Sequence, residues 1–183
     1  MSKRNIIYSL LIILSVLIYY YFSPQNNKGN TIDLDISKAP TYQSEAMLTT
    51  VYDPSGEIIY KIQASQVAYF AEKGESYFSM PDVMLYDRQK SATWHLQANR
   101  AYLTKDRMLS LDGGVQLINL TPHSHLERIE TKRAKINLMN QEITSPETVT
   151  IKGPDFYSTG EKLNGNLKEK TANLLQNVKT FYR

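Results

Sequence analysis

The chain has no cysteine, and it has only three histidines and one tryptophan among its 183 residues. The absence of cysteine excludes disulfide bonds, thiolate metal ligands, a cysteine nucleophile and a lipid attached to an N-terminal cysteine. His123 and His125 form a His-x-His pair, but no further acidic or histidine cluster is spaced to complete a metal site. Motifs for a serine nucleophile elbow, a P-loop and a Rossmann dinucleotide site are also missing. The sequence therefore predicts neither a catalytic centre nor a bound metal or cofactor.

The chain also lacks an excess of charge of one sign. Its formal net charge is +3, and Lys3 and Arg4 supply two of these charges. From Thr41 to the end there are 17 Lys and Arg residues against 16 Asp and Glu residues. A nucleic-acid partner needs a clustered basic face, so the sequence predicts no nucleic-acid binding.

One long apolar run is present, IIYSLLIILSVLIYYYF at residues 6–22, and it contains no charged residue. As a helix it would span about 25 Å, against a bilayer core of about 30 Å. Lys3 and Arg4 precede the run, so the positive-inside rule places residues 1–5 in the cytoplasm and the rest of the chain across the membrane. A cleaved signal peptide is the alternative, although the run is followed by bulky residues rather than the small ones that such a cleavage site needs. Residues 23–40 are polar and are predicted to form a linker.

The remaining residues, 41–183, alternate apolar and polar side chains in short runs that are separated by turns. Alternation with period two is typical of half-buried strands, and no helical spacing lasts for three turns after Phe22. Ile129–Gly153 shows the pattern best, with two alternating arms around a turn at Asn140-Gln141. A lone hairpin is marginal in water, but similar units recur on both sides of this one. Pro81 and Gly113-Gly114 interrupt the alternation and suggest edges or bulges.

This pattern predicts an all-β fold, a twisted open β-jelly roll built from repeated hairpins and preceded by one N-terminal transmembrane helix. Stacked repeats whose ends differ in composition also favour a sheet stack that other chains can extend. The predicted organisation is a cytoplasmic N-terminus at 1–5, an anchor at 6–22, a linker at 23–40 and a β domain at 41–183.

Several short motifs follow one another in a characteristic order and spacing. They are Thr41-Tyr42-x-Ser44-Glu45, Val51-Tyr52-Asp53-Pro54-x-Gly56, Tyr60-x-Ile62-x-Ala64, Trp94-x-Leu96-x-Ala98-x-x-Ala101-x-Leu103-Thr104-x-Asp106-Arg107-Met108-Leu109, Ala134-x-Ile136-Asn137-Leu138, Val149-x-Ile151-x-Gly153 and Gly165-Asn166-Leu167-x-x-Lys170-x-Ala172. In order, spacing and total length the chain closely resembles the LptC family, the inner-membrane component of the lipopolysaccharide export bridge of Gram-negative bacteria. The anchor and the linker match that family in character rather than residue by residue.

The resemblance implies a periplasmic β-jelly roll held at the bacterial inner membrane by a single-pass helix. It also implies three partners: lipopolysaccharide, an inner-membrane ABC transporter with LptB-, LptF- and LptG-type subunits, and a soluble periplasmic bridge protein of the LptA type. The chain would receive lipopolysaccharide from the transporter and pass it to the bridge protein for outer-membrane assembly. No catalysis by this chain is implied, because another subunit would hydrolyse ATP.

In such a roll the inward-facing residues of the strands would form the lipid path, and each of them could equally be ordinary core. These candidates are Met47, Thr49, Val51, Ile62, Ala64, Phe78, Leu96, Ala98, Leu109, Leu111, Val115, Leu117, Ala134, Ile136, Val149 and Ile151. Each CH₂ group kept out of water is worth about 0.8 kcal/mol, so several acyl chains need a continuous apolar route.

Unpaired strands at the two ends of the roll are predicted to dock partners by strand addition. The early strands near Met47 are assigned to the transporter side, and the last strands, from Ala172 to Tyr182, to the bridge protein. Gly153 is the third docking candidate, because it ends a strand where a neighbouring backbone could approach. The sequence leaves open whether two copies pair edge to edge as a weak homodimer.

Two other functions remain open at this point. A membrane-anchored periplasmic scaffold would bind other envelope proteins without carrying lipid. An envelope hydrolase would need an acid/base or nucleophile pair, for which His95 or His125 is the only starting point.

Overall fold

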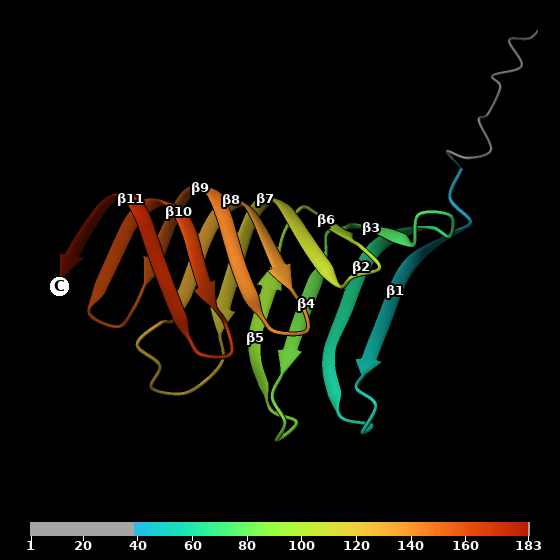
Figure 1. Cartoon of the computed structure of the whole chain (residues 1–183), viewed down its shortest axis with the longest axis horizontal. Helices are drawn as coiled ribbons and strands as arrows, with labels where there is room; N and C mark the ends of the chain where they lie inside the picture. The colour runs from blue at the N-terminus through green and yellow to red at the C-terminus, as the bar shows by residue number, and fades with distance from the viewer. Residues whose placement is uncertain (1–38, 183) are drawn as a thin grey trace, which may run out of the picture. The chain divides into compact units, whose positions relative to one another are not determined.

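The computed structural model describes residues 39–182, and every helix or strand in this part of the chain is a β-strand (Figure 1). The strands are β1 (Tyr42–Tyr52), β2 (Ile58–Phe70), β3 (Glu75–Ser79), β4 (Asp82–Tyr86), β5 (Ala92–Gln97), β6 (Arg100–Leu103), β7 (Met108–Asn119), β8 (Arg128–Asn137), β9 (Glu142–Lys152), β10 (Phe156–Asn166) and β11 (Thr171–Tyr182). Among the described residues there is no helix long and apolar enough to cross a membrane. The predicted anchor at 6–22 lies outside them.

All eleven strands belong to one antiparallel sheet in which neighbours in sequence are neighbours in space. Two apparent exceptions are bent strands: β3 and β4 both pair with β2, and β5 and β6 both pair with β7. Pro81 separates β3 from β4, because proline has no N–H to give to the β2 ladder. The interruption predicted at Pro81 is therefore confirmed, as a break between two strands.

A line of irregularities runs across the sheet, within the long strands and between β3 and β4 or β5 and β6, and forms what we call the crease. The pairing registers skip at Ala46, Met80-Pro81, Ala98-Asn99, Gly113-Gly114, residues 132–133, Pro146-Glu147, Lys162 and Asn177. Of these residues, Ala46, Met80, Gly113, Gly114, Lys162 and Asn177 have positive φ angles, between 48° and 81°. Bulges bend a strand and increase its twist, so an aligned series of them folds the whole sheet over on itself. In Figure 1 the later strands fold over along the upper margin of the view.

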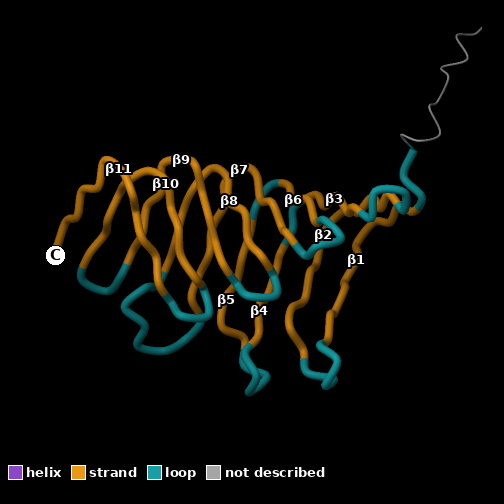
Figure 2. Tube along the Cα trace, in the orientation of Figure 1, coloured by secondary structure: helices purple, strands orange, loops and turns teal. Residues whose placement is uncertain are grey.

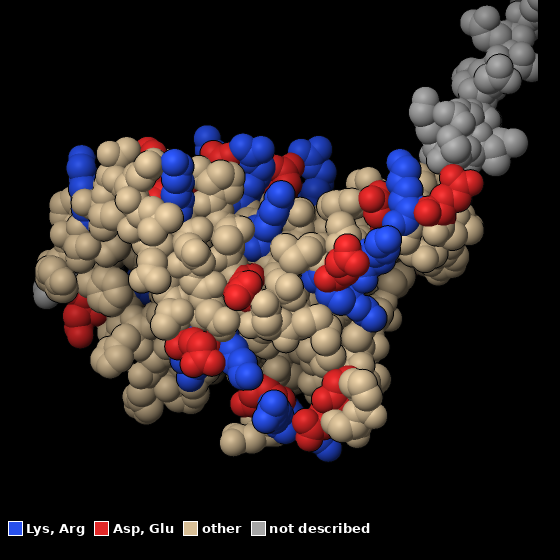
Figure 3. Space-filling view, viewed as in Figure 1, with Lys and Arg blue, Asp and Glu red and all other residues tan. Residues whose placement is uncertain are grey.

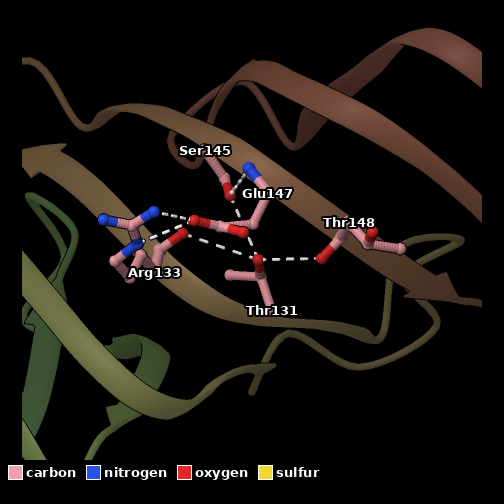
Figure 4. Close-up of polar contacts among 5 residues, drawn as sticks. All are labelled: Thr131, Arg133, Ser145, Glu147 and Thr148. Atoms are coloured by element: carbon pink, nitrogen blue, oxygen red, sulfur yellow. Dashed lines mark hydrogen bonds and ion pairs between the residues drawn. The ribbon is translucent and has the colours of Figure 1, made fainter.

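Side-chain hydrogen bonds connect β8 and β9 at the crease (Figure 4). The Thr131 hydroxyl donates to the carbonyl of Thr148 at 3.0 Å and lies 3.1 Å from the hydroxyl of Ser145. The Ser145 hydroxyl in turn accepts the backbone N–H of Glu147, whose carboxylate pairs with Arg133. Ser145 is buried, and these bonds satisfy its hydroxyl where the regular ladder is interrupted.

The crease divides the sheet into two layers that face each other across an apolar core. Layer 1 contains β3 and β6, layer 2 contains β4 and β5, and the long strands contribute one half to each. Within the Ile129–Gly153 hairpin, Ile136 pairs with Ile143 in layer 1, and Ile129 pairs with Ile151 in layer 2. Alternate residues of both layers point inward, which confirms the predicted period-two pattern and the all-β open roll.

Opposite the crease, the hairpin turns of layer 1 meet the strands of layer 2 along what we call the seam. The indole Nε1–H of Trp94 in β5 donates to the carbonyl oxygen of Leu167 at 2.8 Å across this seam. The guanidinium of Arg107 donates to the hydroxyl of Tyr60 in β2, also at 2.8 Å. Figure 2 shows the loops of both layers, with the loop between β4 and β5 extending below the strands. The middle of the seam is closed, and Trp94 there is fully buried.

Candidate functional site

The structure brings the sixteen predicted inward residues together on the facing surfaces of the two layers. Those in the buried core are Ile62, Ala64, Phe78, Leu96, Ala98, Leu109, Leu111, Val115, Leu117, Ala134, Ile136, Val149 and Ile151. Met47 and Val51 are partly buried against that core, and Thr49 is half-buried between them. Their common placement is thus established, while contact with lipid stays a prediction.

The apolar interior becomes more exposed toward each end of the roll. At the β1 end, Met47, Thr49 and Val51 pair with the inward-facing row of β2. Tyr42 and Tyr69 continue this row past the last buried residues, and both are exposed. The β1 end of the roll is therefore partly open and aromatic, and its inward row continues into the buried core.

At the β11 end the interior opens into a cavity of about 560 Å³, which we call the C-terminal cavity. Apolar side chains from both layers form its floor: Leu126, Ile151, Phe156, Ala172, Leu174 and Val178. Its polar lining residues include His123, His125 and Lys170, and no Asp or Glu lines it. Ligand pockets typically measure roughly 300–1,000 Å³, so this cavity has the size and the mixed lining of a binding site.

The three predicted docking residues all lie at this end of the roll. Ala172 is half-buried and lines the C-terminal cavity, whereas Tyr182 at the end of β11 is 82% exposed. Gly153 lies where the carbonyl of His125 approaches closely: a Cβ atom at position 153 would be 2.5 Å from that oxygen. Their role in docking stays a prediction, and the close approach at Gly153 is made by this chain's own loop.

The loop between β7 and β8, residues 120–127, is the part of the site that sequence reasoning missed. The side-chain amide of Asn119 donates to the Ser124 hydroxyl and to the Leu126 carbonyl, each at 2.8 Å. These bonds fold the loop back on itself and bury Leu126 beneath it. Nothing in the irregular sequence pattern around His123 and His125 indicated that this loop covers one end of the core.

The titratable groups with shifted pKa values lie away from this cavity. A hydrogen bond from Lys152 lowers the pKa of Glu130, and a hydrogen bond to Glu75 raises the pKa of Tyr102 to about 12. Neither Glu130 nor Tyr102 lines the C-terminal cavity, and no cluster of His, Asp and Glu within residues 39–182 has the arrangement of a metal site. Figure 3 shows acidic and basic side chains interspersed on the visible face. The C-terminal cavity can therefore bury an apolar group at the open end of the roll.

A single antiparallel sheet folded over an apolar interior, with one free strand edge at each end of the described residues, defines an open β-jelly roll. Its backbone resembles the crystal structure of LptH from Pseudomonas aeruginosa, described as the LptA-homologous periplasmic component of the conserved lipopolysaccharide transport device. The match has a TM-score of 0.56 at 9% sequence identity, covering 68% of this chain and 94% of LptH, and it shows a shared fold.

Sequence comparison goes further. The family described as lipopolysaccharide-assembly, LptC-related matches residues 8–183. The lipopolysaccharide export system protein LptC of Escherichia coli K12 is 43% identical over 143 residues, which cover 78% of this chain and 75% of that protein. The LptC of Haemophilus influenzae is 36% identical over 200 residues, covering 98% and 96% of the two chains. The chain belongs to the LptC family.

Proposed function

We propose that this chain is the lipopolysaccharide-binding component of an export bridge. It receives lipopolysaccharide from an inner-membrane ABC transporter and passes it to a soluble periplasmic bridge protein. The observation that carries the proposal is the apolar interior, which is continuous from β1 to β11 and opens at the C-terminal cavity. Membership of a family whose relatives are lipopolysaccharide export proteins supports it. The proposal assigns no catalysis to the chain.

The two-layer architecture suits a molecule with acyl chains and a charged sugar head. Acyl chains would lie between the layers, where burial of each CH₂ is worth about 0.8 kcal/mol, while the head would stay in water outside the seam. The interior is tightly packed around Trp94 and Leu96, so a lipid must part the layers or displace side chains to enter the middle. Entry and exit at the two more exposed ends need the smallest rearrangement.

The two edge strands are the proposed docking sites. β1 pairs only with β2, and β11 only with β10, within the described residues, so each has a free edge that can accept a further strand. We assign β1 to the transporter, with LptB-, LptF- and LptG-type subunits, and β11 to an LptA-type bridge protein. Exposed apolar residues on both edges, such as Leu48 and Leu175, favour protein contacts there.

The membrane arrangement is part of the same proposal. Residues 1–5 would lie in the cytoplasm, 6–22 would cross the inner membrane once, 23–40 would form the linker, and 41–183 would lie in the periplasm. The uncharged run at 6–22 and the basic residues before it support this orientation.

The test uses a photo-crosslinking amino acid at Phe78, which is buried on the inner face of β3, in the full chain with its transporter. Tyr77 is the matched control, because it is the preceding residue of the same strand and is exposed on the opposite face. Capture of lipopolysaccharide from Phe78 but not from Tyr77 is the expected result. Capture of protein alone from both positions would favour a scaffold, and depletion of the chain should make lipopolysaccharide accumulate at the inner membrane.

A further inference from the structure

The C-terminal cavity differs in charge from a second cavity farther along the same seam. This seam cavity, about 470 Å³, is lined by three acids and three bases: Asp53, Glu57, Asp87, Arg88, Lys168 and Lys170. The C-terminal cavity shares Lys170, adds His123 and His125, and has no acidic lining residue. An anionic group therefore meets only cationic or neutral side chains at the C-terminal cavity, but it meets carboxylates at the seam cavity.

The floor of the C-terminal cavity is a continuation of the buried core. Ile151 and Leu126 are its buried members, while Phe156, Ala172 and Leu174 are half-buried and pack against the core. The apolar surface of the interior thus reaches solvent at this cavity. A ligand that fits has an apolar chain for the floor and an anion for the polar part of the lining.

We propose that the C-terminal cavity holds one acyl chain of lipopolysaccharide on the Ile151–Phe156–Leu174 floor, with a phosphate of the headgroup bound by Lys170, His123 and His125. This proposal rests on the proposed function and extends it. It assigns a lipid-binding site that selects for a negatively charged headgroup at the C-terminal end of the roll. Lys170 supplies a full positive charge, and the two imidazoles supply N–H donors to phosphate oxygens.

The backbone explains how Lys170 comes to lie at this place. Lys170 ends the β10–β11 turn with a φ of 55°, and its N–H donates to the carbonyl of Leu167. Lys168 lies in the same turn and lines only the seam cavity. The two lysines form a matched pair, because both are exposed, carry the same charge and line the seam cavity, but only Lys170 also lines the C-terminal cavity.

The experiment places a photo-crosslinking amino acid at Phe156 in the full chain in detergent, with a second preparation carrying it at Phe78. Each is exposed to purified lipopolysaccharide and to the same material after its phosphates have been removed. Lys170→Asn removes the charge with a residue that tolerates a positive φ, and Lys168→Asn is the control. We expect Phe156 to capture intact lipopolysaccharide, with about a fivefold loss in Lys170→Asn, the size for one screened charge pair, and little change in Lys168→Asn.

Dephosphorylation should reproduce the loss seen in Lys170→Asn and add nothing further in that variant. Three results would overturn the proposal while leaving the proposed function standing, because Phe78 still captures lipid in each: no lipid captured at Phe156, equal capture in both lysine variants, or capture at Phe156 of a second copy of the chain alone. Absence of lipid at both Phe78 and Phe156 would overturn the proposed function as well. Equal melting temperatures of the two variants establish that the difference is not one of folding.

Discussion

The hydrogen bond between Trp94 and Leu167 joins the two layers of the roll, and its removal should weaken their attachment measurably. The indole lies in β5 of layer 2, and the carbonyl lies in the last hairpin turn of layer 1, 73 residues away in sequence. Trp94→Phe keeps an aromatic ring in the core but takes away the N–H donor. The Leu167 carbonyl would then lose this partner in a fully buried environment.

The expected cost has two parts. The Leu167 carbonyl keeps the backbone N–H of Lys170 as a donor, so losing the indole N–H costs about 0.5–1.5 kcal/mol, the net worth of one hydrogen bond. Replacing indole by the smaller phenyl ring leaves a small cavity, which adds roughly 1 kcal/mol. Together the free energy of unfolding should fall by about 1.5–2.5 kcal/mol, equal to a shift of roughly 1 M in the urea midpoint.

Replacement of Trp94 by benzothienylalanine is the matched control, since a sulfur takes the place of the N–H and the shape of the ring system is retained. It should lose only the hydrogen-bond part, about 0.5–1.5 kcal/mol. Unfolding of residues 41–183 can be followed by circular dichroism in all three proteins, and in the parent also by the emission of Trp94, the chain's only tryptophan. Midpoints for the benzothienyl protein within about 0.3 kcal/mol of the parent would refute the reasoning that this bond holds the layers together.

Three further changes test other parts of the fold. Gly153→Ala would press a methyl group against the His125 carbonyl and should cost about 1–3 kcal/mol, so an unchanged melting temperature would contradict this packing. Lys152→Gln removes the hydrogen bond that lowers the pKa of Glu130. The stabilisation from this pair is present above the usual Glu130 pKa of 4.5 and is lost as pH falls through the lower pKa of the folded state. The variant should therefore be less stable by about 0.5–1 kcal/mol at pH 7, and this difference should shrink in urea titrations at acid pH. Thr131→Val removes the crease hydroxyl and should cost about 1 kcal/mol in the same assay, whereas no change would mean that the bulged backbone alone holds the bend.

Much of the fold could be predicted from the sequence, because the alternation of apolar and polar residues marks its strands and their inward faces. Residues of a strand alternate between the two faces of a sheet, so the inward row of each long strand could be read from apolar spacing. The Ile129–Gly153 hairpin shows this: Ala134, Ile136, Val149 and Ile151 are all buried as expected, and the turn falls between β8 and β9. The recurrence of such hairpins was enough to predict an open roll.

The C-terminal cavity could not be predicted, because it depends on contacts between segments that no local pattern connects. His123 and Leu126 lie in a loop without alternation, and Lys170 lies in a turn that any charged residue could occupy. These residues come together only when the sheet has folded over at the crease. Sequence spacing gives the direction of a side chain within its own strand, but not which loop closes over the end of the core.

The sequence suggests that the interruptions in the apolar alternation are separate edges or bulges. In the structure they are aligned with one another along the crease. Pro81 and Gly113-Gly114 are far apart in sequence, yet both lie on the crease, where the chain passes from one layer to the other within the long strands and between β3 and β4 or β5 and β6. On the opposite side, at the seam, the layers meet through turn packing and side-chain bonds such as those of Trp94 and Arg107. The layers cannot separate at the crease, because the covalent chain runs through it, whereas separating them at the seam costs a few kcal/mol per side-chain contact. A lipid that enters the middle of this roll must therefore open it along the seam and leave the crease intact.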